Sequence, residues 1–183
     1  SLDGISKSPA IFDYKKLDWM NGEYFKSMDS AAFAKLARPF AGDLSAELAE
    51  KWDYAAEVLR PRLSRLGEIK EQIHFLIEMP DYDLDCYTNK RNKTNPEKAR
   101  ALLPEALPML DSLEPWTPDA INAALDAFAE QRGEKKGAVM WPLRIAVSGQ
   151  KVTPGGLTEV LFLLGKKNSL DRLKKSLAKL QDM

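Results

Sequence analysis

The sequence predicts an all-α protein in which about ten short helices form two packed helical subdomains. Three observations support this prediction. Apolar residues recur at spacings of three and four in most segments, as in helices that are buried on one side. Capping residues followed by proline, or a glycine after an apolar run, mark many helix ends. No segment alternates convincingly between apolar and polar residues as a half-buried strand does.

The composition limits the classes of function. The chain has 183 residues, 44% of them hydrophobic, which is enough to bury a sizeable core. One cysteine (Cys86) and one histidine (His74) argue against a disulfide framework, a Cys/His zinc cluster and a catalytic Cys–His pair. No apolar run reaches the ~18 residues of a membrane span. We therefore expect a cytoplasmic protein that does not bind membranes.

The charge is unevenly distributed along the chain. The formal net charge is zero, which argues against an indiscriminate nucleic-acid binder. Residues 131–183 carry 11 Lys and Arg against 4 Asp and Glu, a net charge of +7, which leaves −7 for residues 1–130. This asymmetry favours a polyanionic partner at the C-terminal end. The alternative is that the basic residues of the last helix form only its solvated face; they are Lys166, Lys167, Arg172, Lys174, Lys175 and Lys179.

The first part of the chain is predicted to form closely spaced helices after an extended lead-in over residues 1–14. Asp29 or Ser30 is the expected cap of the second helix, and Asp43 or Ser45 that of the third, which Pro61 ends. The bend that follows carries two arginines, Arg62 and Arg65. The expected helices in this part are 14–28, 29–40, 43–60 and 68–79.

Residues 80–95 are the least regular segment, and we expect them to form a loop between the two subdomains. They contain Asp81, Asp83 and Asp85, which resemble the start of a calcium loop. The glycine and the terminal glutamate that such a loop requires are missing, so no calcium site is predicted.

Two later helices carry the same start signal, in which a capping residue precedes a proline at the first helical position. These pairs are Asn95-Pro96 and Thr117-Pro118. Pro104 and Pro108 interrupt the first of the two helices, which we therefore expect to be kinked or split. The second is expected to end at Gly133.

The stretch from Met140 to Leu157 is predicted to be a helix, a short link and the start of another helix. Gly149 suits a helix end, Thr153 is a good N-cap, and Pro154 suits a first helical turn. The second helix is expected to end at Gly165, and a last helix is expected from Asn168 or Ser169 to about residue 181.

Gly155 and Gly156 would then lie inside a first helical turn, where each costs about 1 kcal/mol relative to alanine. They are explained if a ligand approaches this backbone closely. A helix N-terminus with free amides beside Arg144 favours an anionic or hydrogen-bonding ligand. The alternative is an ordinary corner between two helices.

The preceding helix is predicted to present two different faces. Trp141, Arg144 and Ser148 share one face, on which Arg144 is the candidate for contacting a ligand. Leu143 and Val147 point the other way, into the core. The alternative for Trp141 is packing in the core.

Two distant parts of the chain carry distinctive motifs. The first part has Ile-Ser-Lys-Ser-Pro-Ala-Ile-Phe-Asp at 5–13 and Lys-Leu-Asp-Trp-Met-Asn-Gly at 16–22. The second has Trp-Pro-Leu-Arg at 141–144, Thr-Pro-Gly-Gly-Leu at 153–157 and Leu-Leu-Gly-Lys at 163–166, supported by Leu-Arg-Pro-Arg at 59–62 and Trp-Thr at 116–117. In this order and over essentially all 183 residues, they resemble bacterial-type glutamyl-tRNA synthetases: the first part resembles the segment after the family's catalytic signature, and the second its C-terminal anticodon-binding region.

The resemblance implies part of a ligase that activates glutamate with ATP and attaches it to tRNA(Glu). The catalytic domain, with ATP and Mg²⁺, would precede Ser1, so we expect no catalytic residue, metal or cofactor in this part and no activity from it alone. We also expect a monomer. The implied division is 1–28 as the end of the stem-contact domain, 29–94 as a first anticodon-binding helical subdomain and 95–183 as a second.

By motif position, the family's anticodon-binding residues fall on Arg62, Arg144, Thr153, Pro154, Gly155, Gly156 and Leu157. Arg62 sits where the family contacts the third anticodon base, and an arginine there is associated with acceptance of tRNA(Glu) and rejection of tRNA(Gln). Single-stranded RNA loops are recognised through the edges of splayed bases, for which arginine offers a planar fork of donors. The second glycine of Gly155-Gly156 departs from the single glycine of the family, which leaves the register from Leu157 onward open.

Two alternatives remain at this point. One is a helical protein–protein interaction module whose basic end docks an acidic partner. The other is an enzyme that charges both the glutamate and the glutamine tRNA, or the glutamine tRNA alone.

Overall fold

The computed structural model describes residues 13–183, so the predictions for residues 1–12 lie outside the described part. Within it, ten α-helices are present and no strand, apart from an isolated bridge between Asn89 and Thr94. The predicted all-α class is confirmed. The α-helices are α1 (Tyr14–Ser27), α2 (Ser30–Ala37), α3 (Ala46–Glu50), α4 (Trp52–Leu59), α5 (Ile69–Ile77), α6 (Pro96–Asp111), α7 (Pro118–Gln131), α8 (Lys136–Ser148), α9 (Leu157–Leu164) and α10 (Lys166–Gln181). The 3₁₀ helices are η2 (Arg38–Phe40), η3 (Arg60–Arg62), η4 (Leu66–Glu68) and η5 (Leu84–Tyr87).

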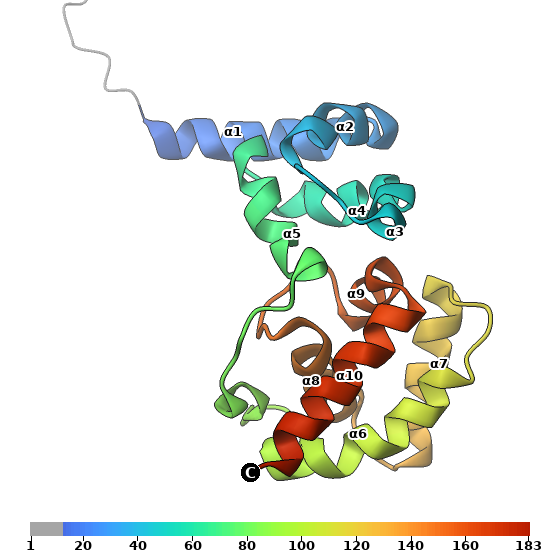
Figure 1. Ribbon diagram of the computed structural model, residues 1–183. Coiled ribbons are helices and arrows are strands. Elements are labelled where there is room, and N and C mark those ends of the chain that lie inside the picture. Colours follow the sequence, from blue (N-terminus) through green and yellow to red (C-terminus); the bar gives the residue numbers. More distant parts are fainter. Residues whose placement is uncertain (1–12) are drawn as a thin grey trace, which may run out of the picture.

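The helices form two groups that are stacked on each other (Figure 1). Helices α1 to α4 make the N-terminal group, and α6 to α10 make the C-terminal group, in which α10 packs along α6. Helix α5 runs from the first group toward the second, where it contacts α9. The chain therefore consists of two packed helical subdomains, as predicted.

The predicted capping residues determine where several helices begin. The side chains of Asp29, Ser45, Asn95 and Thr117 each accept a hydrogen bond from a backbone N–H in the first turn that follows. Such bonds satisfy amides that have no partner within the helix. Gly149 ends α8 with a φ of 65°, as the glycine after the apolar run predicted.

Some large apolar side chains in the first part of the chain are exposed. On α1, Phe25 is buried, whereas Trp19 and Tyr24 are 65% and 63% exposed. The reason is that α1 packs mainly against the short η3, so the described chain covers only part of its apolar surface. Phe40 and Ile77, which lie at helix ends, are also exposed.

Helix α6 is one continuous helix in spite of Pro104 and Pro108, so it is not split. Both prolines are exposed and are four residues apart, which places them on the same outward face. The backbone carbonyls that lose a helical donor at each proline therefore face solvent, where water can satisfy them. The opposite face of α6 packs against α10.

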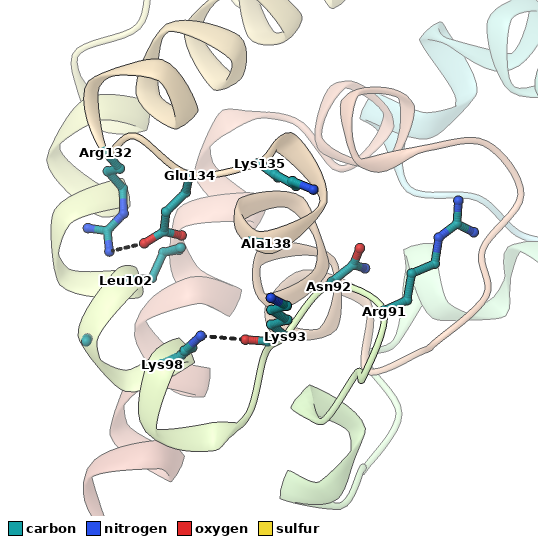
Figure 2. Close-up of a pocket in the computed structure, with 10 residues that line it drawn as sticks. Arg91, Asn92, Lys93, Lys98, Leu102, Arg132, Glu134, Lys135 and Ala138 are labelled. Atoms are coloured by element: carbon teal, nitrogen blue, oxygen red, sulfur yellow. Dashed lines mark hydrogen bonds and ion pairs between the residues drawn. The ribbon is translucent and has the colours of Figure 1, made fainter.

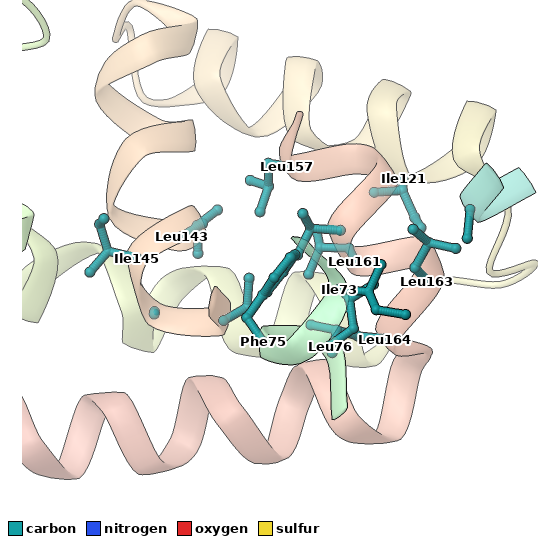
Figure 3. Close-up of a cluster of buried hydrophobic side chains, with 14 of the residues drawn as sticks. Ile73, Phe75, Leu76, Ile121, Leu143, Ile145, Leu157, Leu161, Leu163 and Leu164 are labelled. Carbon is teal, nitrogen blue, oxygen red and sulfur yellow. The ribbon is translucent and has the colours of Figure 1, made fainter. Parts of the chain in front are cut away.

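The two groups share one hydrophobic core at their junction. Figure 3 shows Ile73 and Phe75 of α5 beside the leucines of α9, among them Leu161. Helix α5 thus links the two groups, since it follows η4 in the chain and packs against α9 of the C-terminal group. The predicted boundaries at residues 28 and 94 remain predictions.

Arg172 of α10 joins three helices at this junction. Its guanidinium donates to the carbonyls of Phe75 at 2.6 Å, Val147 at 2.9 Å and Leu76 at 3.1 Å, which lie at the C-terminal ends of α5 and α8. Burial lowers the pKa of Arg172 to about 10, which keeps the side chain charged at neutral pH. Arg172 therefore does not lie on the solvated face of the last helix, to which the alternative interpretation of the charge pattern assigned it. That helix also begins at Lys166, not at residue 168 or 169.

Candidate nucleic-acid interface

The link between α8 and α9, residues 150–156, differs from its predicted form. Thr153 is not an N-cap, because α9 begins only at Leu157 and Gly156 is its N-cap residue. Gly155 has a φ of 75°, which is not helical, so the two glycines precede the helix instead of lying in its first turn. The amide of Gly156 donates to Glu159 Oε2 at 2.7 Å, and this bond establishes the later start.

The glycines of the link pack closely against the chain itself. A Cβ atom on Gly155 would lie 2.8 Å from Cγ1 of Val58 on α4 and 2.9 Å from the Cβ of Glu159. A Cβ atom on Gly156 would lie 2.9 Å from the Glu159 carboxylate. The sequence interpretation, in which a ligand approaches these glycines, thus has a competing explanation: Gly155 lets the link pack onto the first group of helices.

The link and the bend after α4 form one surface pocket, which we call the link pocket. Its volume is about 370 Å³. It brings Arg62 together with Thr153 and Pro154, which lie some ninety residues further along the chain. Among the residues that the structure describes, no hydrogen bond or ion pair occupies the Arg62 side chain, although the carboxylate of Glu71 lines the same pocket. The link pocket is lined by Arg62, Glu71, Gln72, Gln150, Val152, Thr153 and Pro154.

Arg144 of α8 lies beside Arg62 in an electrostatically unfavourable setting. Its Nε is buried and has no hydrogen-bond partner within residues 13–183. Burial first, and then the positive charge of Arg62, hold the pKa of Arg144 below its ordinary value, while the charge of Glu159 acts in the opposite direction. Arg62 thus offers unused donors at the link pocket, and Arg144 adds a second positive charge and a buried donor without a partner, an arrangement that a bound anion or base edge would stabilise.

Not every predicted site residue offers its side chain to a ligand. Leu157 is 1% exposed and lies in the core (Figure 3), and Thr153 is 2% exposed, with its hydroxyl donating to the Gly155 carbonyl at 3.2 Å. The prediction that Trp141 and Ser148 lie with Arg144 on the side of α8 away from the core is also wrong. Ser148 is fully buried, and the indole N–H of Trp141 donates to the Cys86 carbonyl at 3.0 Å.

Four residues of the link pocket were missed by the sequence analysis. Glu71 and Gln72 come from α5, and Gln150 and Val152 come from the link. Val152 is 72% exposed, so it offers an apolar surface at the pocket. No local pattern distinguishes these residues from other surface positions, because only the packing of α5 beside the link brings them to Arg62.

The basic side chains of α10 are used in different ways. Lys166 donates to Glu114 at 2.7 Å and Lys179 to Asp81 at 2.9 Å, so both are paired with other parts of the chain. Lys174 and Lys175 are exposed. The positive charge of this end is thus available only in part.

Across residues 13–183, no helix combines the length and the apolar character that crossing a membrane demands.

Comparisons with known proteins agree with this architecture. The chain is 40% identical over 181 residues to the glutamate–tRNA ligase of Clostridium novyi (strain NT), covering 97% of this chain and 37% of that protein. It is 41% identical over 180 residues to the glutamate–tRNA ligase of Clostridium tetani (strain Massachusetts / E88), covering 97% and 36%. The chain spans little more than a third of the length of these relatives.

A solved structure has the same fold. The glutamate tRNA ligase from Elizabethkingia meningosepticum CCUG26117 matches 98% of this chain and 35% of its own length, with a TM-score of 0.80 and 23% identity. In addition, residues 32–177 match the family model of the anticodon binding domain, a range that runs from within α2 to within α10 and leaves out α1. The chain therefore belongs to the anticodon-binding domain family.

Proposed function

We propose that the chain is the anticodon-recognising part of a glutamate–tRNA ligase and that the link pocket receives the third anticodon base of tRNA(Glu). One observation carries this proposal. Arg62 and the Thr153-Pro154 segment line the same pocket, and Arg144 beside them has a buried donor without a partner. These are the positions to which the family resemblance assigns anticodon binding.

The chemistry of the pocket is complementary to cytosine. The pairing edge of cytosine carries two acceptors, O2 and N3, and one donor, the N4 amino group. Arg62 supplies a fork of donors, and Glu71 supplies a carboxylate that can accept from N4. Guanine presents an N–H in place of the N3 acceptor, so it would leave a donor of Arg62 facing another donor.

The reaction itself belongs to a longer protein in this proposal. Since the chain spans about a third of the relatives, we assign glutamate activation, ATP and Mg²⁺ to parts of the ligase outside these residues. The chain alone is expected to bind tRNA(Glu) as a monomer and to transfer no glutamate. Detectable glutamyl transfer by the purified chain would contradict this assignment.

The experiment compares two anticodon stem-loops that differ only at the third anticodon base, C against G. Fluorescence anisotropy of each labelled RNA with the chain is measured at about 50 mM and about 200 mM salt. We expect a preference for C of about tenfold or more, as for a base contact of about 1–3 kcal/mol, and its loss in Arg62→Gln. The affinity for both RNAs should fall as the salt concentration rises.

Arg100→Gln provides the matched control, because Arg100 is an exposed arginine on α6 that does not line the link pocket. It should retain the preference for C. Equal binding of both RNAs by the unchanged chain would contradict recognition of the third base. Absence of RNA binding even at low salt would favour a protein interaction module.

A further inference from the structure

A second pocket lies at the other end of α8, and we call it the basic pocket (Figure 2). Its volume is about 350 Å³. Its walls come from the loop before α6, the start of α6, the end of α7 and the start of α8. It is lined by Arg91, Asn92, Lys93, Lys98, Ala101, Leu102, Arg132, Glu134, Lys135 and Ala138.

Positive charge predominates around this pocket, and much of it has no partner. Five of the lining residues are Lys or Arg and one is Glu. The side chains of Arg91, Lys93 and Lys135 are exposed, and within residues 13–183 none of them makes an ion pair or a hydrogen bond. Like charges that are gathered around a concave surface raise the local concentration of anions.

The remaining basic residues hold the pocket in shape. Lys98 Nζ donates to the Lys93 carbonyl at 2.6 Å, which ties α6 to the loop. Arg132 at the end of α7 pairs with Glu105 and, at 3.0 Å, with Glu134 (Figure 2). The charges that remain available to a ligand are therefore those of Arg91 and Lys93 on the loop and Lys135 at the start of α8.

The loop that carries Arg91 and Lys93 is held by contacts of its own. Asn89 and Thr94 exchange backbone hydrogen bonds, both at 3.1 Å, and close the turn. Asn92 packs onto the start of α8 so closely that a Cβ atom on Gly137 would lie 2.4 Å from its Oδ1. The rim of the basic pocket is therefore positioned by packing before any ligand binds, and its floor includes the apolar side chain of Leu102.

We propose that the basic pocket binds a phosphate group of an RNA backbone, beyond the nucleotide that enters the link pocket. This inference rests on the proposed function, since it assumes that RNA is the ligand. Helix α8 runs from the basic pocket to the link, and its 13 residues span roughly 20 Å at 1.5 Å per residue. Phosphates along one strand of a nucleic-acid helix are about 3.4 Å apart along the axis, so on the order of six nucleotides cover this distance.

The test uses the whole chain and a stem-loop RNA with C at the third anticodon position. Arg91→Ala combined with Lys135→Ala removes two unpaired charges of the basic pocket. We expect binding on the order of tenfold weaker near physiological salt. The slope of log affinity against log salt should become shallower by about 0.7 for each phosphate of a single strand that the variant no longer neutralises. The preference for C over G should persist, because Arg62 is unchanged.

Lys174→Ala combined with Lys175→Ala is the matched control, because it removes two exposed charges of α10 that line neither pocket. This control should leave the slope unchanged. Equal losses of RNA affinity in both double variants would mean that the RNA is attracted by the overall positive charge of the protein and not by the basic pocket. This result would overturn the proposal. Thermal unfolding of both double variants should match that of the unchanged chain, since all four side chains are exposed.

A second measurement distinguishes an RNA phosphate from a free one. Inorganic phosphate and 5′-AMP are titrated while the NMR methyl signals of Leu102 and Ala138 are followed. Tight binding of either compound, together with RNA affinity that the pocket variant does not alter, would assign the pocket to a free phosphorylated ligand and overturn the RNA proposal. A shallower slope in the pocket variant without any preference for C would support this inference while contradicting the proposed role of Arg62.

Discussion

Arg62 and Arg144 lie close enough for the charge of Arg62 to add to the effect of burial in lowering the pKa of Arg144. They come from different parts of the fold, since Arg62 ends η3 and Arg144 lies on α8. No carboxylate in the described part of the chain forms an ion pair with either arginine. Two neighbouring cations that lack a direct counterion destabilise the free protein, and a bound acceptor would relieve this repulsion.

Replacing Arg144 should therefore separate stability from RNA binding. Arg144→Met keeps an unbranched apolar chain, removes the buried Nε that has no partner and removes the repulsion from Arg62. Because a buried unsatisfied donor costs about 1–3 kcal/mol, we expect an unchanged or higher free energy of unfolding in urea. RNA affinity should fall by about tenfold or more. A large loss of stability would instead indicate that Arg144 is a structural residue.

Glu71 should contribute to the choice between cytosine and uracil. Uracil has an oxygen where cytosine has its N4 amino group, so a carboxylate that accepts from N4 would repel uracil. We expect the chain to bind a stem-loop with C at the third position more tightly than one with U. In Glu71→Gln this difference should shrink by several-fold, because an amide can rotate to donate or accept. An unchanged ratio of the two affinities would place Glu71 outside the contact.

Gly155 and Gly156 should respond differently to substitution by alanine. Gly155→Ala combines a φ of 75° with contacts of 2.8 Å to Val58 and 2.9 Å to Glu159, so we expect a loss of about 2–3 kcal/mol in unfolding free energy. Gly156 has a φ of −90° and meets only the end of the Glu159 side chain, so Gly156→Ala should cost under about 1 kcal/mol. Equal costs, measured by urea unfolding, would argue against packing on α4 as the role of Gly155.

Arg172 should be essential for joining the two groups of helices. Arg172→Ala leaves the carbonyls of Phe75, Leu76 and Val147 without their donor and opens a cavity, so we expect a loss of about 3–5 kcal/mol. Lys175→Ala, on the exposed side of the same helix, should change stability by at most about 0.5 kcal/mol. Calorimetry of both variants tests this, and similar melting temperatures would contradict the role that we assign to Arg172.

Local signals in the sequence predicted most of the helices. Capping side chains and prolines act within one helical turn, so Asn95-Pro96 and Thr117-Pro118 begin α6 and α7 as expected. The same kind of signal failed at Thr153-Pro154, where a positive φ at Gly155 and the bond from Gly156 to Glu159 delay the helix. The expected split of the helix at Pro104 and Pro108 does not occur, for a related reason. The energetic cost of a proline inside a helix depends on whether the proline faces solvent, and the local sequence does not specify this.

The candidate site was predictable in part. The family resemblance identified Arg62 and Arg144, and in the structure the charge of Arg62 contributes to lowering the pKa of Arg144. It could not identify Glu71, Gln72 or Gln150, because their proximity to Arg62 arises only when α5 packs beside the link. Nor could it show that Thr153 and Leu157 are buried.

The sequence by itself determined the helical class and many helix boundaries, because caps, prolines and apolar spacing act over a few residues. Tertiary structure alone decided which side chains face solvent and which remote segments meet. The guanidinium of Arg172 shows the difference: its helix position suggested a solvated cation, yet the ends of α5 and α8 enclose it and supply three carbonyls. Whether a side chain is buried depends on which elements pack against it, and those elements come from distant parts of the chain.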